Sequence, residues 1–321
     1  MFCSIILIYE ICNFEFQEQD MITTDNIHSD FNIELANKKR IVNTMLERLL
    51  AEARDIHRDL REALRYTLQG QGKRIRAALL MWCCEVVSGS TNDAAEIAAA
   101  AVEMIHTSSL VHDDLPAMDN DDMRRGRPTC HRQFDEATAI LAGDALIISA
   151  FEALAKHISQ PAVSSALITE LAEAAGAEGM IAGQIADLKA EKVKGTKLIL
   201  EYIHTNKTAK MFRAAAGMGA ICGNAGKKEY ERLRDYGLKI GLGFQISDDI
   251  LDVSATSEQL GKTTGKDEKA EKVTYPAVVG LEKSREIAAK LADEAMAIIE
   301  PFGKKADNLR KLTTALLQRK K

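Results

Sequence analysis

The chain has 321 residues, of which 46% are hydrophobic and 28% charged, a composition typical of a globular protein with a large core. Its net charge is −5, so it lacks the basic character of a nucleic-acid-binding protein, and we expect no nucleic-acid partner. Only five prolines and 5% aromatic residues occur, and this composition favours helices.

The six cysteines show no CxxC spacing, which disfavours a zinc site. Cys83 and Cys84 are adjacent in a helical segment and cannot easily face a common partner. We therefore interpret all six as reduced thiols and predict a cytoplasmic protein.

The amino terminus differs from the rest of the chain. The apolar run Ile5–Tyr9 is too short to span a bilayer and lacks the basic flank of a signal peptide, so we expect no stable membrane insertion. Met21 begins a more typical polar leader. We interpret residues 1–31 as a disordered or start-site extension and predict a single domain over residues 32–321.

Apolar residues recur at helical spacing through nearly all of this domain. The Gly70–Gly72 segment and the loop at Ser88–Asn92 interrupt the pattern, and residues 254–275 are polar and predicted to form a loop. No strand-like alternation and no linker between cores is found, so the sequence predicts one all-α domain of about ten helices. The predicted helical segments are 32–68, 73–86, 93–112, 134–150, 163–188, 198–222, 230–253 and 276–318.

Two clusters of aspartates are the main functional signal. Asp113, Asp114 and Asp119 form the first, and Asp248, Asp249 and Asp252 form the second. Two carboxylates about 6 Å apart repel by about 3 kcal/mol at an effective dielectric near 20. Because oxygen-rich carboxylate sites suit Mg²⁺, the clusters predict bound divalent cations.

The spacing within each cluster decides which carboxylates can converge. Asp248 and Asp252 are four residues apart and share one face of a helix whose neighbours are apolar, which disfavours a solvated acidic face. Asp113 and Asp119 are six apart, and a regular helix turns about 600° over that distance. Pro116 predicts a break that would bring Asp119 back, but alone this segment is equally an acidic loop with counter-charges.

Basic side chains accompany these clusters. Lys73, Arg74 and Arg76 follow a glycine-rich segment and open a helix, and His106 lies seven residues before Asp113, at nearly the same helical azimuth. The basic helix start alone is as readily a solvated feature, and a lone histidine at His106 is more often a structural hydrogen-bonding residue than a ligand. Carboxylates and cations together predict a diphosphate ligand bridged by metal. A P-loop nucleoside triphosphatase is disfavoured because no Walker A pattern occurs.

Over about residues 40–320 the chain resembles the trans-polyprenyl diphosphate synthases. This family includes the farnesyl and geranylgeranyl diphosphate synthases. The four-residue interval between the first aspartate pair and Asp119 is similar to the bacterial and plant form. Gln71 departs from the family, which usually has glycine there. The matching motifs, in order, are Gly72–Arg76, His106, Asp113-Asp114-x4-Asp119 with Arg124-Arg125-Gly126, Gly183-Gln184, Lys207-Thr208 and Phe244-Gln245-x2-Asp248-Asp249-x2-Asp252.

The resemblance implies an all-α bundle around a deep central cavity, usually a homodimer, that condenses isopentenyl diphosphate with dimethylallyl, geranyl or farnesyl diphosphate. It implies roughly three Mg²⁺ ions bound by Asp113, Asp119 and Asp248. Further implied roles are catalytic for Asp113, Asp114, Asp119, Asp248, Asp249 and Lys207; allylic diphosphate binding for Arg124, Lys207, Thr208, Gln245, Lys262 and Lys266; and isopentenyl diphosphate binding for Lys73, Arg76, His106 and Arg125.

In this family, residues on the helix before the first aspartates form the floor of the tail pocket. The fifth residue before Asp113 is Ser108, about 7.5 Å down the axis, and Ile105 and Ala101 continue the stripe. Farnesyl enzymes of this form often carry an aromatic residue where Ser108 stands. Serine leaves room for a C20 product, which we favour over C15, although Ile105 or Trp82 would shorten the pocket if either blocked it.

Two other functions fit parts of the pattern. A terpene cyclase shares the helices and the first motif, but it needs no second basic set, and its second metal motif usually mixes Asn, Ser and Glu. A non-catalytic subunit of a heteromeric synthase would be expected to lose an aspartate cluster. Here both clusters are intact, and Lys73, Arg76 and Arg125 favour condensation.

Overall fold

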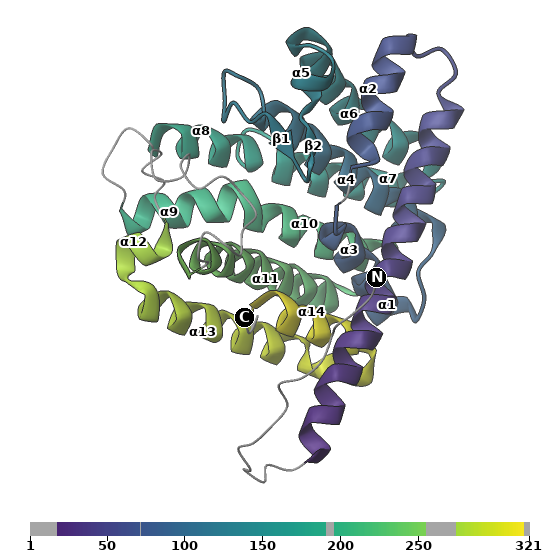
Figure 1. Ribbon diagram of the computed structural model, residues 1–321. Coiled ribbons are helices and arrows are strands. Elements are labelled where there is room, and N and C mark those ends of the chain that lie inside the picture. Colours follow the sequence, from purple (N-terminus) through teal and green to yellow (C-terminus); the bar gives the residue numbers. More distant parts are fainter. Residues whose placement is uncertain (1–17, 71, 191–195, 255–273, 318–321) are drawn as a thin grey trace, which may run out of the picture.

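The structure is a computed structural model that describes residues 18–70, 72–190, 196–254 and 274–317. It confirms the predicted all-α fold (Figure 1). The elements are α1 (Glu18–Glu52), α2 (Arg58–Leu68), α3 (Ile75–Ser88), α4 (Asp93–Asp113), β1 (Met123–Arg124), β2 (Arg127–Pro128), α5 (Cys130–Gln133), α6 (Glu136–His157), α7 (Pro161–Ala175), α8 (Met180–Ala190), α9 (Lys197–Ile203), the π-helix η1 (His204–Ala209), α10 (Lys210–Cys222), α11 (Lys227–Ser254), α12 (Tyr275–Val279), α13 (Leu281–Ile299), the 3-10 helix η2 (Glu300–Ala306) and α14 (Asp307–Leu317).

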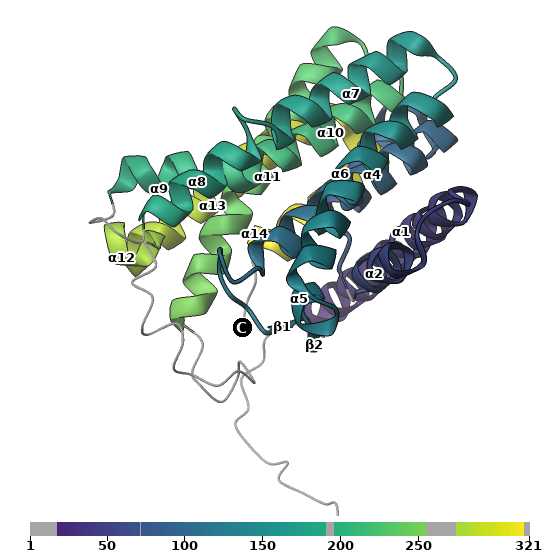
Figure 2. The ribbon, with the colours of Figure 1, turned by 90° about the horizontal axis from the view of Figure 1, so that it is seen from above.

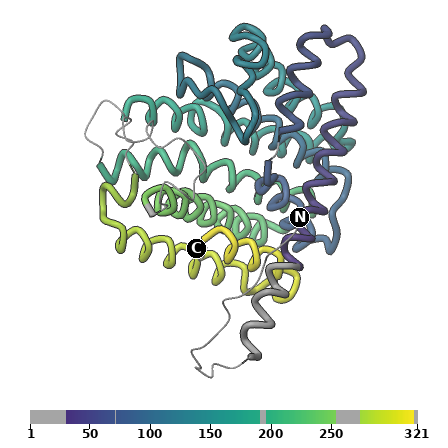
Figure 3. The backbone as a smooth tube through the Cα atoms, viewed as in Figure 1, coloured from purple at the N-terminus to yellow at the C-terminus, as the bar shows by residue number. Residues whose placement is uncertain are grey.

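The helices form stacked layers. From top to bottom in Figure 1, α8 lies above α9 and α10, which lie above α11, and α13 and α14 form the lowest layer. Seen from above in Figure 2, α1 and α2 pack as a pair along one side of the bundle. The backbone trace in Figure 3 shows α11 enclosed between the layers formed by α10 and α13.

Small residues let the central helices approach closely. Ala98–Ala101 of α4 are fully buried, and α4 packs chiefly against α6. The largest buried side chains are Trp82, Phe212 and Tyr236, and the Tyr236 hydroxyl donates a hydrogen bond to the carbonyl of Leu309 at 2.7 Å. The main apolar core therefore joins residues of helices from both ends of the chain, including α1 and α14, and a smaller cluster that includes Leu200 and Tyr275 is separate from it.

Several helix boundaries differ from the sequence prediction. The first helix begins at Glu18 rather than near residue 32. The segment predicted as one helix over 163–188 is divided at Gly176, and the last predicted helix is divided at Gly280, whose φ is +87°. The division into an extension over 1–31 and one domain over 32–321 stays a prediction.

Helix α6 is unusually apolar. Among the described residues it alone is long and apolar enough to cross a membrane, by length and composition only, with 39% of its apolar window buried. Its inner residues Ala142, Leu146 and Ala150 pack in the core, as expected for a core helix of a globular protein. Ile148 on its other side is 67% exposed. Packing in the core explains the apolar residues on the inner face of α6, but it does not explain the exposed apolar residues on the outer face.

Candidate active site

The first aspartate motif begins at the end of α4. After Leu115 the chain turns back, so that the N–H of Asp119 donates to the carbonyl of Asp113 at 2.9 Å, and the N–H of Asp121 donates to that of Asp114 at 3.2 Å. The break predicted at Pro116 is thus present, and it returns the backbone of Asp119 to Asp113 as expected.

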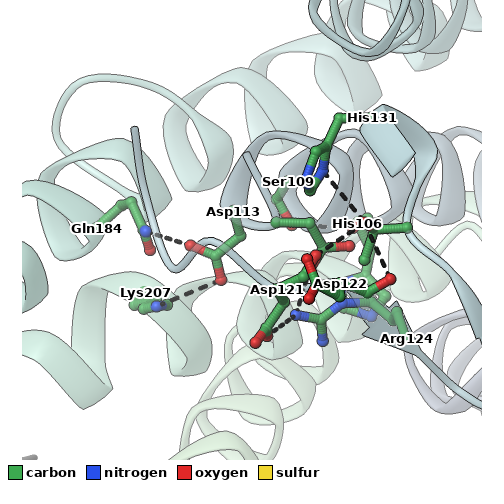
Figure 4. Close-up of polar contacts among 11 residues, drawn as sticks. His106, Ser109, Asp113, Asp121, Asp122, Arg124, His131, Gln184 and Lys207 are labelled. Carbon is green, nitrogen blue, oxygen red and sulfur yellow. Dashed lines mark hydrogen bonds and ion pairs between the residues drawn. The ribbon is translucent and has the colours of Figure 1, made fainter. Parts of the chain in front are cut away.

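Asp113 lies where α8 and η1 meet the end of α4. Gln184 of α8 donates a hydrogen bond to one carboxylate oxygen of Asp113, and Lys207 Nζ of η1 lies 3.7 Å from the other (Figure 4). Burial alone would lower the pKa of Lys207, but the carboxylates of Asp113 and Asp187 raise it above its ordinary value. Lys207 is therefore positively charged at neutral pH.

Asp187 is a site residue that the sequence reasoning missed. Its Oδ2 lies 2.7 Å from Lys207 Nζ, closer than Asp113. The available signal was its position three residues after Gln184, which places both side chains on one face of α8. Asp187 and Gln184 therefore fix the positions of Lys207 and Asp113 relative to each other.

A glycine allows this contact between α8 and η1. A Cβ added to Gly183 would lie 2.1 Å from the backbone nitrogen of Lys207, a separation that real Cβ atoms do not reach. The family motif Gly183-Gln184 is thereby explained physically: the glycine permits close approach, and the glutamine binds Asp113.

The two arginines after the first motif point to different places. The β1–β2 hairpin turns at Arg125 and Gly126, both with positive φ (52° and 76°), as in the type I′ turns of two-residue hairpins. Arg124 Nε donates to buried Asp114 at 2.5 Å, and its guanidinium also pairs with Asp121 at 3.3 Å. Burial raises the pKa of Asp114, and Arg124 opposes that shift. Arg124 and Asp121 are visible together in Figure 4.

Arg125 instead joins the basic set at the start of α3. A Cβ on Gly72 would lie 2.7 Å from Arg125 Nη1, so this glycine leaves space for the guanidinium. Arg74 does not join the set as a ligand, because it is buried and paired with Glu103 at 3.2 Å, with φ of 53° at the helix start. Lys73 is exposed.

Arg76 and His106 form the inner part of this basic set. Arg76 Nη1 lies 3.3 Å from His106 Nε2, and its guanidinium carbon lies 4.7 Å from the centroid of the Phe212 ring. Burial lowers the pKa of Arg76 to about 10, and burial with the neighbouring arginines lowers the pKa of His106 well below its ordinary value. Arg76 Nε is buried and has no hydrogen-bond partner in the described part of the chain. Such a cation is suited to receive an anion.

The second motif lies on α11. Asp248 is half-buried and Asp252 exposed, whereas Asp249 is buried and accepts a hydrogen bond from the N–H of Tyr275 at 2.9 Å. Burial raises the pKa of Asp249 to about 6. Gln245 contacts Asp249 at 3.4 Å and accepts a hydrogen bond from the Thr208 hydroxyl at 3.1 Å.

The π-helix η1 thus connects the two motifs. Lys207 contacts Asp113 of the first motif, and Thr208 contacts Gln245, one turn before Asp248 and Asp249. The predicted set Lys207, Thr208 and Gln245 is brought together. Lys262 and Lys266 lie outside the described residues, so their predicted roles stay predictions.

Carboxylate oxygens are the ligand type that Mg²⁺ prefers, but among the described residues too few of them converge at one point to fill its coordination shell. Across the described ranges no three His, Cys, Asp or Glu side chains lie close enough to hold a metal ion by themselves. Mg²⁺ is usually bound by one or two carboxylates, with water and phosphate oxygens completing its shell. Two aspartate motifs that each offer an incomplete oxygen shell therefore fit Mg²⁺ shared with a diphosphate.

The predicted chain-length residues Ser108, Ile105 and Ala101 are all buried on α4. The Ser108 hydroxyl donates a hydrogen bond to the carbonyl of Ile105 at 2.8 Å, which removes the need for any other partner. Trp82 is also buried, and its ring packs against Phe31 at 5.6 Å. The role of the stripe in product length stays a prediction.

The fold and the paired aspartate motifs define a prenyltransferase. A sequence profile described as polyprenyl synthetase matches residues 57–315, and the chain belongs to this family. The chain is 47% identical over 288 residues to the heterodimeric geranylgeranyl pyrophosphate synthase large subunit 1, chloroplastic, of Arabidopsis thaliana, covering 87% of this chain and 76% of the relative.

Solved structures agree in fold. Geranyltransferase from Legionella pneumophila aligns with a TM-score of 0.81 and 35% identity, covering 91% of this chain and 98% of that one. Geranyltransferase from Helicobacter pylori, complexed with magnesium and isoprenyl diphosphate, aligns with a TM-score of 0.73 and 31% identity, covering 89% and 96%. The predicted family, fold class and prenyltransferase activity are confirmed.

The predicted cytoplasmic location is wrong. The similar plant synthases, including those of Arabidopsis thaliana and Capsicum annuum, are named as chloroplastic proteins. Reduced cysteines indicate only a reducing environment, and that property does not separate the cytosol from the plastid interior.

Proposed function

We propose that the chain condenses isopentenyl diphosphate head-to-tail with an allylic diphosphate in a Mg²⁺-dependent reaction, in a plastid. The observation that carries this proposal is the half-buried Arg76, in a second cationic site apart from the Lys207 site. Its Nη1 lies 3.3 Å from His106 Nε2, and its buried Nε has no hydrogen-bond partner among the described residues. An enzyme that only ionises one diphosphate needs a single such site. Two cationic sites support two diphosphate substrates.

The first site would take the allylic diphosphate. Lys207, Thr208 and Gln245 already converge between the aspartate motifs. Arg124, Lys262 and Lys266 complete the predicted set, and Arg124 would have to exchange Asp114 and Asp121 for substrate oxygens. Asp113, Asp119 and Asp248 would hold roughly three Mg²⁺ ions, which would supply charge neutralisation on the leaving diphosphate.

The second site would hold isopentenyl diphosphate through Lys73, Arg76, His106 and Arg125. Cleavage of the allylic carbon–oxygen bond leaves an allylic cation, the isopentenyl double bond attacks it, and a proton passes to the departed diphosphate. The protein residues position both substrates and exclude water, because water would capture the cation. Asp114 and Asp249 support the motifs from buried positions.

We favour a geranylgeranyl (C20) product over farnesyl (C15). The support is the small Ser108 before the first motif and the name of the Arabidopsis relative as a geranylgeranyl synthase. A Ser108→Tyr variant is expected to shorten the main product, as measured by chromatography of the dephosphorylated prenols. An unchanged product from a folded variant would remove Ser108 from the floor of the tail pocket.

We propose a homodimer. On α6, Ile140, Leu141 and Ile148 are 45%, 59% and 67% exposed, a large apolar surface for a face in water. The Arabidopsis relative is named as a subunit of a heterodimer, so a second, non-identical chain is the other candidate partner.

Diphosphate release by the purified chain tests the proposed activity. Release is expected only when isopentenyl diphosphate, an allylic diphosphate and Mg²⁺ are all present, and EDTA should abolish it. Release from the allylic substrate alone would favour a terpene cyclase. No release by the chain alone, with release after addition of a second subunit, would favour the non-catalytic subunit.

A further inference from the structure

One buried polar side chain beside the second motif has no role in the proposed substrate sites. His204 is the first residue of η1 and is 5% exposed. Its Nδ1 is buried and has no hydrogen-bond partner in the described part of the chain, a cost of about 1–3 kcal/mol for a polar atom. An apolar side chain would fill the same space without that cost, so the imidazole is expected to have another role.

The other ring nitrogen faces the second motif. His204 Nε2 lies 3.5 Å from Oδ2 of Asp249, and that same oxygen accepts the N–H of Tyr275 at 2.9 Å. The tautomer with its N–H at Nε2 points a donor at the carboxylate, whereas the other tautomer would place a nitrogen lone pair against the lone pairs of Oδ2. The second carboxylate oxygen, Oδ1, faces Gln245 Nε2 at 3.4 Å. Protein groups therefore surround both oxygens of Asp249.

The ring of His204 is itself held in place. It stacks on the ring of Tyr275, with centroids 5.3 Å apart and planes at 29°. Tyr275 is buried in a small apolar cluster with Leu200, Ile246 and Ala288, separate from the main core. Since Ile246 lies on α11 just before the second motif, this cluster fixes His204, Tyr275 and α11 relative to one another.

We propose that His204 is a positioning residue for the second aspartate motif. With Tyr275 it fixes the buried carboxylate of Asp249, and this sets the direction in which the adjacent Asp248 is presented to metal-bound diphosphate. The inference rests on the proposed function, because it assigns Asp248 to the metal. Carboxylates next to a metal site commonly depend on such supporting contacts, and losing one typically costs 10–100-fold in metal affinity or activity.

The test compares three variants. His204→Phe keeps the ring and its stacking on Tyr275 but removes the N–H, and His204→Gln restores an N–H donor of similar reach. His157→Phe is the matched control, because His157 also lies near a carboxylate, Glu52 at 3.6 Å, but on α6 outside the site. The readouts are kcat, KM for isopentenyl diphosphate, the Mg²⁺ concentration for half-maximal rate, and the rise in Tm produced by Mg²⁺ with inorganic diphosphate.

For His204→Phe we expect a fall in kcat of about tenfold or more and a similar rise in half-saturating Mg²⁺. KM for isopentenyl diphosphate should be unchanged, and the rise in Tm with Mg²⁺ and diphosphate should shrink. His204→Gln should recover most of these values, and His157→Phe should match wild type.

The proposal is overturned if His204→Phe matches wild type in its Mg²⁺ dependence. It is also overturned if both variants at 204 lose Tm equally without ligand and the Gln variant shows no recovery, since that is a packing effect. Failure of the proposed function is distinct: wild type itself would then form no product, while the Tm measurements would still compare the variants.

Discussion

At the scale of single residues, identical side chains acquire different tasks from small backbone differences. Arg124 and Arg125 are adjacent, yet a two-residue turn sends one to Asp114 and the other toward Gly72. Asp248 and Asp249 are likewise adjacent, and only Asp249 is buried. The motifs determine which residue types occur at the site, whereas the backbone conformation determines where each side chain points.

Arg76 provides the residue-scale prediction. Arg76→Ala should lower kcat/KM for isopentenyl diphosphate by about two orders of magnitude, since a charge-assisted hydrogen bond to a phosphate contributes about 1.5–3 kcal/mol. KM for the allylic substrate should change little. Arg232→Ala is a suitable control, because that arginine is exposed and bonds only a backbone carbonyl at 3.1 Å among its identified hydrogen bonds. Equal losses for both substrates would contradict separate sites.

The sequence predicts a set of candidate site residues, but it does not identify every side chain that contacts them. The aspartates are identifiable from type and spacing, and the turn at Pro116 from its proline. The roles of Lys207, Thr208 and Gln245 are predicted only through the family resemblance. Asp187 was missed because its significance depends on α8 meeting η1, a tertiary contact. The ion pair between Arg74 and Glu103 was missed because it requires a left-handed backbone at Arg74, where no glycine signals it.

At the scale of elements, the π-helix η1 is the feature that sequence periodicity could not predict. It lies between α9 and α10 in a segment predicted as one regular helix, and it directs His204, Lys207 and Thr208 toward the two motifs. Single π-turns inside helices are often found at functional sites, because the extra residue changes where the following side chains point.

The contact between α8 and η1 gives the element-scale prediction. Gly183→Ala should destabilise the fold by about 1–3 kcal/mol, because the new methyl group meets rigid backbone at Lys207. The loss of activity should exceed what the loss of folded protein explains, since Lys207 would also be displaced. Gly226→Ala is the matched control: its nearest atom is 3.7 Å away, so Tm and activity should be preserved. Urea unfolding and steady-state rates measure both effects, and a tolerated Gly183→Ala would contradict the close packing.

At the scale of the whole molecule, the apolar outer face of α6 calls for a partner. Ile148→Glu should convert a dimer into a folded monomer, because a charge placed in a dry interface costs several kcal/mol. Leu198→Glu on α9 is the control, since Leu198 is 78% exposed on another helix. Light scattering with size-exclusion chromatography gives the mass of each. A wild-type monomer, or an Ile148→Glu variant that remains dimeric, would contradict the proposed interface.

We propose that the two aspartate motifs and the two cationic sites act together to join two diphosphate substrates. The most direct measurement is product analysis after the purified chain alone is incubated with isopentenyl and dimethylallyl diphosphates, with and without Mg²⁺. We predict all-trans prenyl diphosphates up to C20 with Mg²⁺, and none without it. No product longer than the supplied allylic substrate in the presence of Mg²⁺ would contradict it.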